Sequence, residues 1–326
     1  MRTSGPFRLS VALAFLLMVS FLRSMPVVGH SAAARPSSNF EVVGEKRPEE
    51  QQGRIRREVN LVNVLANVLD RENRPAPDLP KESFEVYEEG VLQKIEVFES
   101  ETHQSLDLAL MIDSSLSTQK EMLLAREAAA HFIRQVVRPG DRLSVFEFSE
   151  SVTQLTPFTS DVPVLQAAVR RVQEGAGTSL YDAVLLASEA LARRDSNRRR
   201  VIVLVTDAGE TTSRADFDNT RRAALKAETL LYTIVIRPVK NESGRNTAGE
   251  HAIQTITETT GGAMFFPDQA ADLDRIFDRI DRELRTQYRV GYYPHPRGPA
   301  SSFRHITIKV KGDYTARSRQ GYFTAP

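Results

Sequence analysis

The chain contains no cysteine among its 326 residues. It therefore has no disulfide, no thiolate metal site and no cysteine nucleophile. Neither sign of charge is in clear excess, because 43 basic and 42 acidic side chains leave a formal net charge of +1. A balanced chain of this kind gives no reason to expect nucleic-acid binding or strong attraction to a membrane surface.

Common enzyme motifs are absent as well. The six histidines show no metal-ligand spacing. The sequence has neither the Gly-x-Ser-x-Gly elbow of serine hydrolases nor the Gly-x-x-x-x-Gly-Lys-Ser/Thr loop of nucleotide-binding proteins. These absences predict that the protein is not an enzyme.

One long apolar run stands near the N-terminus, from Val11 to Leu22. Arg2 and Arg8 precede it, and small residues follow at 31–34, which is the layout of a secretory signal peptide. The run is shorter than the roughly 20 residues that a membrane-spanning helix needs. We therefore predict a signal peptide over 1–34, an exported protein of the periplasm or the extracellular space, and no membrane span after cleavage. A retained N-terminal anchor is the alternative.

The chain after the signal begins with a polar segment and continues with β structure. Residues 35–57 are rich in Pro, Glu, Arg and Gln and predict a flexible linker. Residues 58–103 predict an N-terminal β segment, with a strand over 59–69. Alternating apolar residues on both sides of Glu88-Glu89-Gly90 predict a hairpin with arms around 84–86 and 95–97.

From residue 104 to 287 short apolar runs alternate with amphipathic segments. This alternation predicts a mostly parallel sheet with helices on both faces. The expected strands are 108–112, 142–148, 201–206, 231–236 and 263–266, with 152–156 as an antiparallel edge strand. The expected helices are 119–137, 162–173, 180–193, 214–228, 250–259 and 272–285.

Residues 288–326 return to short β-branched and aromatic runs, "YRVGYYP", "FRHITIKVK" and "ARSRQGYF". Neither this C-terminal β segment nor the N-terminal one would bury a two-sided core alone. We therefore expect the two to pack together. The predicted fold class is α/β, a Rossmann-like unit inserted in or flanked by a small β-sandwich-like domain.

Polar side chains follow two of the predicted strands and precede one helix. Asp113, Ser115 and Ser117 follow the first parallel strand, Asp207 follows the 201–206 strand, and Thr178 stands in a Gly-rich loop before a helix. Ligands of open α/β sheets bind at the carboxyl ends of the strands. All five side chains offer oxygen, which suits Mg²⁺, with Mn²⁺ or Ca²⁺ as the other candidates, rather than Zn²⁺ or Cu²⁺.

Each of these residues also has a structural explanation. Ser117 and Thr178 stand where a helix N-cap is expected, and Asp207 taken alone is a loop residue. The basic run from Arg193 to Arg200 indicates a solvated helix end, with a contact patch as the alternative. The coincidence of all three polar segments at strand ends favours the metal site.

The pattern Asp113-x-Ser115-x-Ser117, then Gly177-Thr178, then Thr206-Asp207 resembles the metal-ion-dependent adhesion site of von Willebrand factor A domains. The resemblance covers about 106–285, and the flanks are similar to the exported VWFA-related acidobacterial domain family. It implies that Ser115, Ser117 and Thr178 coordinate a divalent cation directly, while Asp113 and Asp207 act mostly through water. A Glu or Asp carboxylate of a protein partner would complete the shell.

One residue departs from the family pattern. The family has glycine directly after the second aspartate, but here Ala208 stands there and Gly209 follows. The sequence therefore predicts an exported, metal-dependent protein-binding module for adhesion or assembly. Two alternatives stay open: a metal-dependent hydrolase of phosphate esters, for which Glu210 is the one further carboxylate nearby, and a structural domain with a vestigial metal site.

Overall fold

The structure is a computed structural model that describes residues 61–100, 103–115, 119–236 and 247–324. The predicted signal peptide 1–34, the predicted linker 35–57 and Ser117 lie outside these residues. Residues 57–326 form one compact unit. Among the described residues, no helix combines the length and the apolar character needed to cross a membrane.

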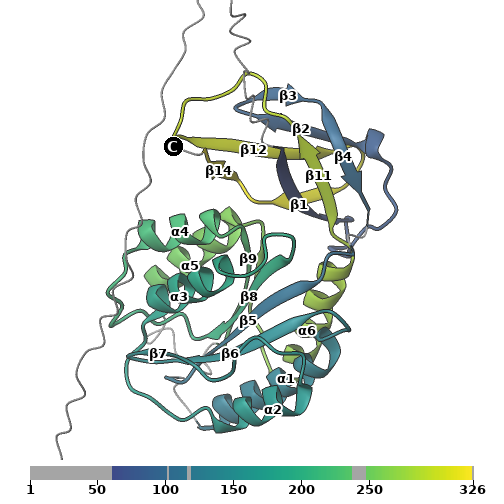
Figure 1. Cartoon of the computed structure of the whole chain (residues 1–326). Helices are drawn as coiled ribbons and strands as arrows, with labels where there is room; N and C mark the ends of the chain where they lie inside the picture. The colour runs from purple at the N-terminus through teal and green to yellow at the C-terminus, as the bar shows by residue number, and fades with distance from the viewer. Residues whose placement is uncertain (1–60, 101–102, 116–118, 237–246, 325–326) are drawn as a thin grey trace, which may run out of the picture. The chain divides into compact units, whose positions relative to one another are not determined.

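A six-stranded sheet forms the centre of the α/β part (Figure 1). Its order is β10-β9-β8-β5-β6-β7, and every neighbouring pair is parallel except β6 with β7. The predicted parallel sheet and its antiparallel edge strand are thus confirmed. The strands are β5 (Leu106–Asp113), β6 (Arg142–Phe148), β7 (Val152–Gln154), β8 (Arg199–Thr206), β9 (Thr229–Val235) and β10 (Ala263–Phe265).

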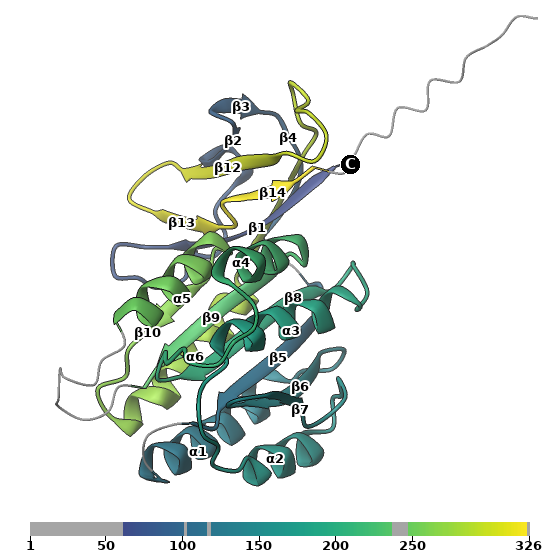
Figure 2. The ribbon, with the colours of Figure 1, turned by 90° about the vertical axis from the view of Figure 1, so that its left-hand side faces the viewer.

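Helices cover both faces of this sheet (Figure 2). Leu108 and Leu110 of β5 pack in the apolar cluster of one face, and Ala109 and Met111 pack in the cluster of the other. This period of two explains why β5 is apolar at every position except Asp107 and Asp113 and is fully buried. The first face carries α1 (Gln119–Val136), α2 (Val162–Arg171) and α6 (Ala270–Arg285); the second carries α3 (Leu180–Ala192), α4 (Phe217–Lys226) and α5 (Thr247–Thr259).

The flanking segments form two four-stranded antiparallel sheets, β13-β1-β11-β4 and β14-β12-β2-β3. One apolar cluster joins them, with Val64 and Val290 from the first sheet and Val86 and Ile308 from the second. A 3-10 turn, η1 (Lys81–Ser83), precedes β2. The strands are β1 (Val62–Leu69), β2 (Phe84–Glu88), β3 (Val91–Gln93), β4 (Ile95–Glu99), β11 (Tyr288–Tyr292), β12 (Phe303–Val310), β13 (Thr315–Ser318) and β14 (Gly321–Phe323).

Strands from before and after the parallel sheet pair with each other. In the first sheet β1 lies between β11 and β13, and in the second sheet β2 pairs with β12. Both sheets thus need chain from each side of the α/β part, and neither could form from one flank alone.

Two expectations for these strands were wrong in detail. The predicted hairpin stops at β3, and its continuation β4 pairs with β11 in the other sheet, because the chain crosses between sheets at Lys94. The run "ARSRQGYF" is likewise divided between the two sheets, as β13 and β14. Alternating apolar residues indicated strands here, but they did not indicate which partner each strand would find.

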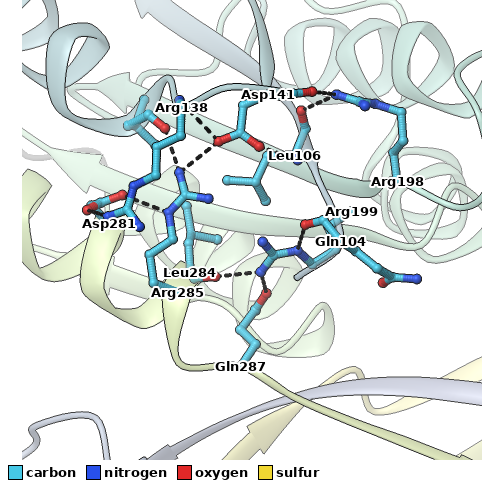
Figure 3. A network of polar contacts seen from close by, with 12 residues as sticks. Gln104, Leu106, Arg138, Asp141, Arg198, Arg199, Asp281, Leu284, Arg285 and Gln287 are labelled. Atoms are coloured by element: carbon cyan, nitrogen blue, oxygen red, sulfur yellow. Dashed lines mark hydrogen bonds and ion pairs between the residues drawn. The ribbon is translucent and has the colours of Figure 1, made fainter. Parts of the chain in front are cut away.

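The basic run 193–200 is only in part a solvated helix end: Arg193 at the end of α3 is exposed, whereas the arginines that follow it are partly or fully buried. Arg194 and Arg198 donate hydrogen bonds to the buried carboxylate of Asp107, at 2.9 and 2.8 Å. Arg199 is only 4% exposed and donates to the backbone oxygen of Gln104 and the side-chain oxygen of Gln287 (Figure 3). These arginines join the start of the parallel sheet to the segment that leaves α6.

A second buried network joins α6 to the flanking strands. The side chain of Glu283 has no exposed surface and accepts hydrogen bonds from Arg279, from the hydroxyl of Tyr232 at 3.0 Å and from Arg317 of β13. Asn67 of β1 donates to the same tyrosine oxygen at 3.3 Å. Burial and the neighbouring carboxylate raise the pKa of Tyr232 well above its usual value, so its hydroxyl stays a donor.

We predict that Glu283→Gln lowers the free energy of unfolding by about 2–4 kcal/mol, because two arginines lose the charge that compensates them. Urea unfolding followed by circular dichroism measures the change. The matched control is Glu258→Gln at an exposed position of α5, which should shift stability by less than about 0.5 kcal/mol. Equal effects of the two substitutions would contradict the importance of this network.

Candidate metal site

The candidate site lies at the carboxyl ends of β5 and β8. These two strands are adjacent and parallel, with Ile112 paired to Val205, so their last residues reach the same edge of the sheet. After β5 the chain adds β6 on one side, and it later adds β8 on the other side. This reversal of strand order is the point where open α/β sheets bind ligands.

Asp113 holds the centre of the site and is completely buried. Its Oδ1 accepts hydrogen bonds from the backbone N–H of Ser115 at 2.9 Å and from the Ser115 hydroxyl at 2.5 Å. Its Oδ2 accepts from the hydroxyl of Thr206 at 2.6 Å. The carboxylate therefore fixes the first loop to the end of β8.

The hydroxyls of Ser115 and Thr178 meet at 2.6 Å, although the two residues come from different loops. The second carboxylate, that of Asp207, lies beside Gly209. A Cβ at this glycine would stand 3.0 Å from Asp207 Oδ1 and 3.2 Å from Thr178 Oγ1. The carboxylate and the hydroxyl thus face one small space, which a side chain at 209 would fill. Four of the five predicted site residues come together here, and Ser117 lies outside the described residues.

Hydroxyl groups behind the site hold its loops in place. Thr211 accepts the backbone N–H of Thr178 at 2.8 Å through its side chain, and the hydroxyls of Ser179 and Thr212 lie 2.8 Å apart. The supporting roles of these hydroxyls were not predicted from the sequence, although Thr206 stands in the motif beside Asp207. The hydroxyl-rich run 211–213, four residues after Asp207, is the one signal that could have indicated Thr211 and Thr212.

Glu210 serves a different purpose from the catalytic one considered above. Its carboxylate accepts the backbone N–H groups of Ser213 at 2.9 Å and Tyr181 at 3.1 Å, and the Ser213 hydroxyl at 2.7 Å. Tyr181 lies in the first turn of α3, where backbone N–H groups lack helical partners. Glu210 therefore caps a helix, and it is neither a solvated loop acid nor an available acid or base.

Ala208 adopts the conformation that a glycine would take. Its φ is +63°, and its side chain is completely buried among apolar residues of the second face. The loop therefore keeps the left-handed turn despite the alanine. The strain costs about 1–2 kcal/mol, while burial of the methyl group returns about 0.8 kcal/mol.

The donor set fits a hard divalent cation. The described donors are two hydroxyls and two carboxylates, all oxygen ligands. Burial and the nearby charge of Asp207 raise the pKa of Asp113 to about 6, against hydrogen bonds that lower it. A bound cation would stabilise the charged form of this buried carboxylate. Within the described ranges no three His, Cys, Asp or Glu side chains cluster as metal ligands, so hydroxyls are needed to build the site.

We predict that Asp113→Asn stabilises the metal-free protein. The folded-state pKa, about 6, lies above the ordinary 3.8. Stability from the protonated carboxyl is therefore complete below about pH 3.8 and is lost as pH rises through 6. At pH 7.5 in EDTA, the neutral amide should raise the free energy of unfolding by on the order of 1–3 kcal/mol. Urea unfolding at pH 7.5 and pH 4 tests this, and the gain should vanish at pH 4. A variant less stable than the wild type at pH 7.5 contradicts the prediction.

Substitutions at Ala208 test the balance of strain and burial. Ala208→Gly relieves the backbone but loses the buried methyl and adds freedom to the unfolded chain, so stability should stay within about 1 kcal/mol. Ala208→Val places a β-branched residue at positive φ and should cost more than about 2 kcal/mol. Chemical unfolding measures both. A glycine variant stabilised by more than about 2 kcal/mol would show that the strain is uncompensated.

Comparison with known proteins gives a family match for part of the chain. Residues 108–210 match the family model described as the von Willebrand factor type A domain. A search of curated proteins gives no match.

Several solved structures are similar to parts of this chain at low sequence identity. A von Willebrand factor type A protein from Catenulispora acidiphila is 12% identical, with a TM-score of 0.50 over 82% of this chain and 73% of that one. BatB from Bacteroides thetaiotaomicron is 14% identical, with a TM-score of 0.45 over 56% of this chain and 100% of its own. The vWF domain of the type V pili tip protein Mfa5 from Porphyromonas gingivalis is 14% identical. Its TM-score is 0.44 over 55% of this chain and 96% of that one. Residues 108–210 of this chain are thus similar to the von Willebrand factor type A domain.

Proposed function

We propose that the protein is an exported protein-binding module that uses a divalent cation, Mg²⁺ in the first place, to capture an acidic side chain of a partner. The observation that carries the proposal is the meeting of Ser115, Thr178 and the two carboxylates at one edge of the sheet. Export rests on the signal-like N-terminus of the sequence.

The site residues would have different roles in binding the cation. Ser115 and Thr178, with Ser117, would hold the cation through hydroxyls. Asp113 orients the Ser115 hydroxyl and ties it to β8, and Asp207 adds the second negative charge. The cation supplies a Lewis-acidic position for a carboxylate. Hydroxyl ligands are neutral, so the site favours an anionic group from outside.

The two alternatives find less support. A phosphate-ester hydrolase needs a further acid or base beside the metal, and Glu210, the candidate for it, is engaged in capping α3. A vestigial site was suggested by Ala208 alone, and this alanine keeps the left-handed turn that the family's glycine would make. Adhesion or assembly through a metal-held carboxylate is therefore the function that the geometry supports best.

We predict saturable binding of one divalent cation per chain by residues 35–326, measured by calorimetry and by thermal melting with Mg²⁺, Mn²⁺ and Ca²⁺. Ser115→Ala should weaken binding at least about tenfold, since a direct ligand is lost. Ser114→Ala is the matched control, because this neighbouring hydroxyl donates to the backbone oxygen of Phe148 and faces away from the site's ligands.

Two results would overturn the metal site: no binding at millimolar cation, or equal weakening in both serine variants. The partner chemistry is tested with immobilised acidic peptides and copies in which Gln replaces Glu. Retention of the acidic peptides should require the cation and be lost in EDTA. Equal retention of the Gln copies would refute capture of a carboxylate.

A further inference from the structure

A small cavity lies at the amino ends of the parallel strands, opposite the candidate metal site at their carboxyl ends. Its volume is about 160 Å³, and it is bordered by the amino ends of β8 and β9 and by residues of β1, β11 and the β13–β14 turn. Neither the metal site nor its supporting hydroxyls reach it. The cavity therefore needs an explanation of its own.

Arginine dominates the lining. Five arginines are among the residues that line the cavity, and Glu228 is the one acidic residue among them. The five are Arg198, Arg199, Arg200, Arg289 and Arg319. Amides and hydroxyls, among them Asn63, Asn197 and Thr229, add further hydrogen-bond donors.

Carboxylates compensate three of these arginines. Asp107 pairs with Arg198, Glu99 with Arg289, and Glu228 with Arg319.

Arg199 and Arg200 have no ion-pair partner within the part of the chain that the structure describes. Arg199 donates to the backbone oxygen of Leu284 in α6, and Arg200 to that of Ala227 after α4. Helix C-termini carry only about half a negative charge each. The lining thus keeps an excess of positive charge.

Burial first, and then the nearby Arg285, lower the pKa of Arg199 to about 10, while Asp141 acts against this shift, and the group stays charged at neutral pH. The Nε atoms of Arg200 and Arg319 are buried and have no hydrogen-bond partner among the described residues. The protein itself therefore does not satisfy every donor of these two guanidinium groups.

We propose that this cavity binds a small oxyanion, with the chemistry of a phosphate, a sulfate or a short carboxylate. The two arginines without an ion-pair partner disfavour a cation, and a neutral apolar ligand would leave their charge uncompensated. A volume of about 160 Å³ is enough for a small oxyanion. Arg199 and Arg200 are the residues that the anion would neutralise.

The experiment is a titration of the purified protein with inorganic phosphate, sulfate and acetate in separate arms, at constant ionic strength and without divalent cations. Calorimetry and the melting midpoint are the readouts. The diagnostic variants lie at Asn197, an exposed residue of the lining whose backbone N–H is held by Asp195. Asn197→Asp adds a negative charge to the rim, Asn197→Lys adds a positive one, and Asn197→Ala is the neutral control.

We expect saturable binding of at least one of the three anions. Asn197→Asp should weaken it at least about threefold, Asn197→Lys should strengthen it, and Asn197→Ala should leave it nearly unchanged. The anion that binds most tightly assigns the class. Sulfate and phosphate stabilise many proteins without binding. Midpoints that rise equally in all three variants, without saturation, therefore overturn the proposal, and so does the absence of binding heat.

Discussion

Parallel pairing of β5 with β8 is the constraint on which the site depends. The register that sets Ile112 against Val205 also sets Asp113 beside Thr206. The side chains of Asp113 and Thr206 are joined by a 2.6 Å hydrogen bond, which links the two strands at their carboxyl ends. The two loops that follow are then held within reach of each other. Thr178 enters from a third loop and is fixed by Thr211, so the site forms only when three separate parts of the chain have folded.

The two edges of the same sheet carry opposite chemistry. The carboxyl edge gathers hydroxyls and carboxylates, and the amino edge gathers arginines that bind buried aspartates and helix C-terminal carbonyls. Helix dipoles give a reason for this division, since parallel strands and their connecting helices place helix N-termini at one edge and C-termini at the other. A cation at one edge and an anion at the other would each meet groups of opposite charge.

Much of the fold and part of the site could be predicted from the sequence, for physical reasons that individual elements make clear. The apolar run of β5 and the amphipathic period of α1 are local signals, and both elements lie where they were expected. Asp113, Ser115 and Asp207 were expected to lie close together because the carboxyl ends of parallel strands share an edge, and the structure brings them together with Thr178. The assignment of these four residues and of Ser117 as metal ligands stays a prediction.

What the sequence could not provide are partners that arise only from tertiary packing. β4 was expected to continue a hairpin, yet it joins the other sheet, because alternation fixes the face of a strand and not its neighbour. Glu210 offered no sequence signal for its role, since the N-terminus that it caps belongs to a helix about thirty residues earlier. Arg199 likewise looked like surface charge until β8 placed it beneath α6.

The pairing of β1 with strands near the other end of the chain sets an order in time. Val62 lies opposite Tyr292, so β1, the first of the described strands to leave the ribosome, is among the last to be paired. Ribosomes add roughly 5–20 residues per second, which leaves β1 without its partner for on the order of 10 seconds or more. Its sequence, VNVLANVL, is uncharged and β-prone, the kind of segment that aggregates when exposed. An unpaired β1 would thus leave a newly made chain prone to aggregation until β11 and β13 have been made.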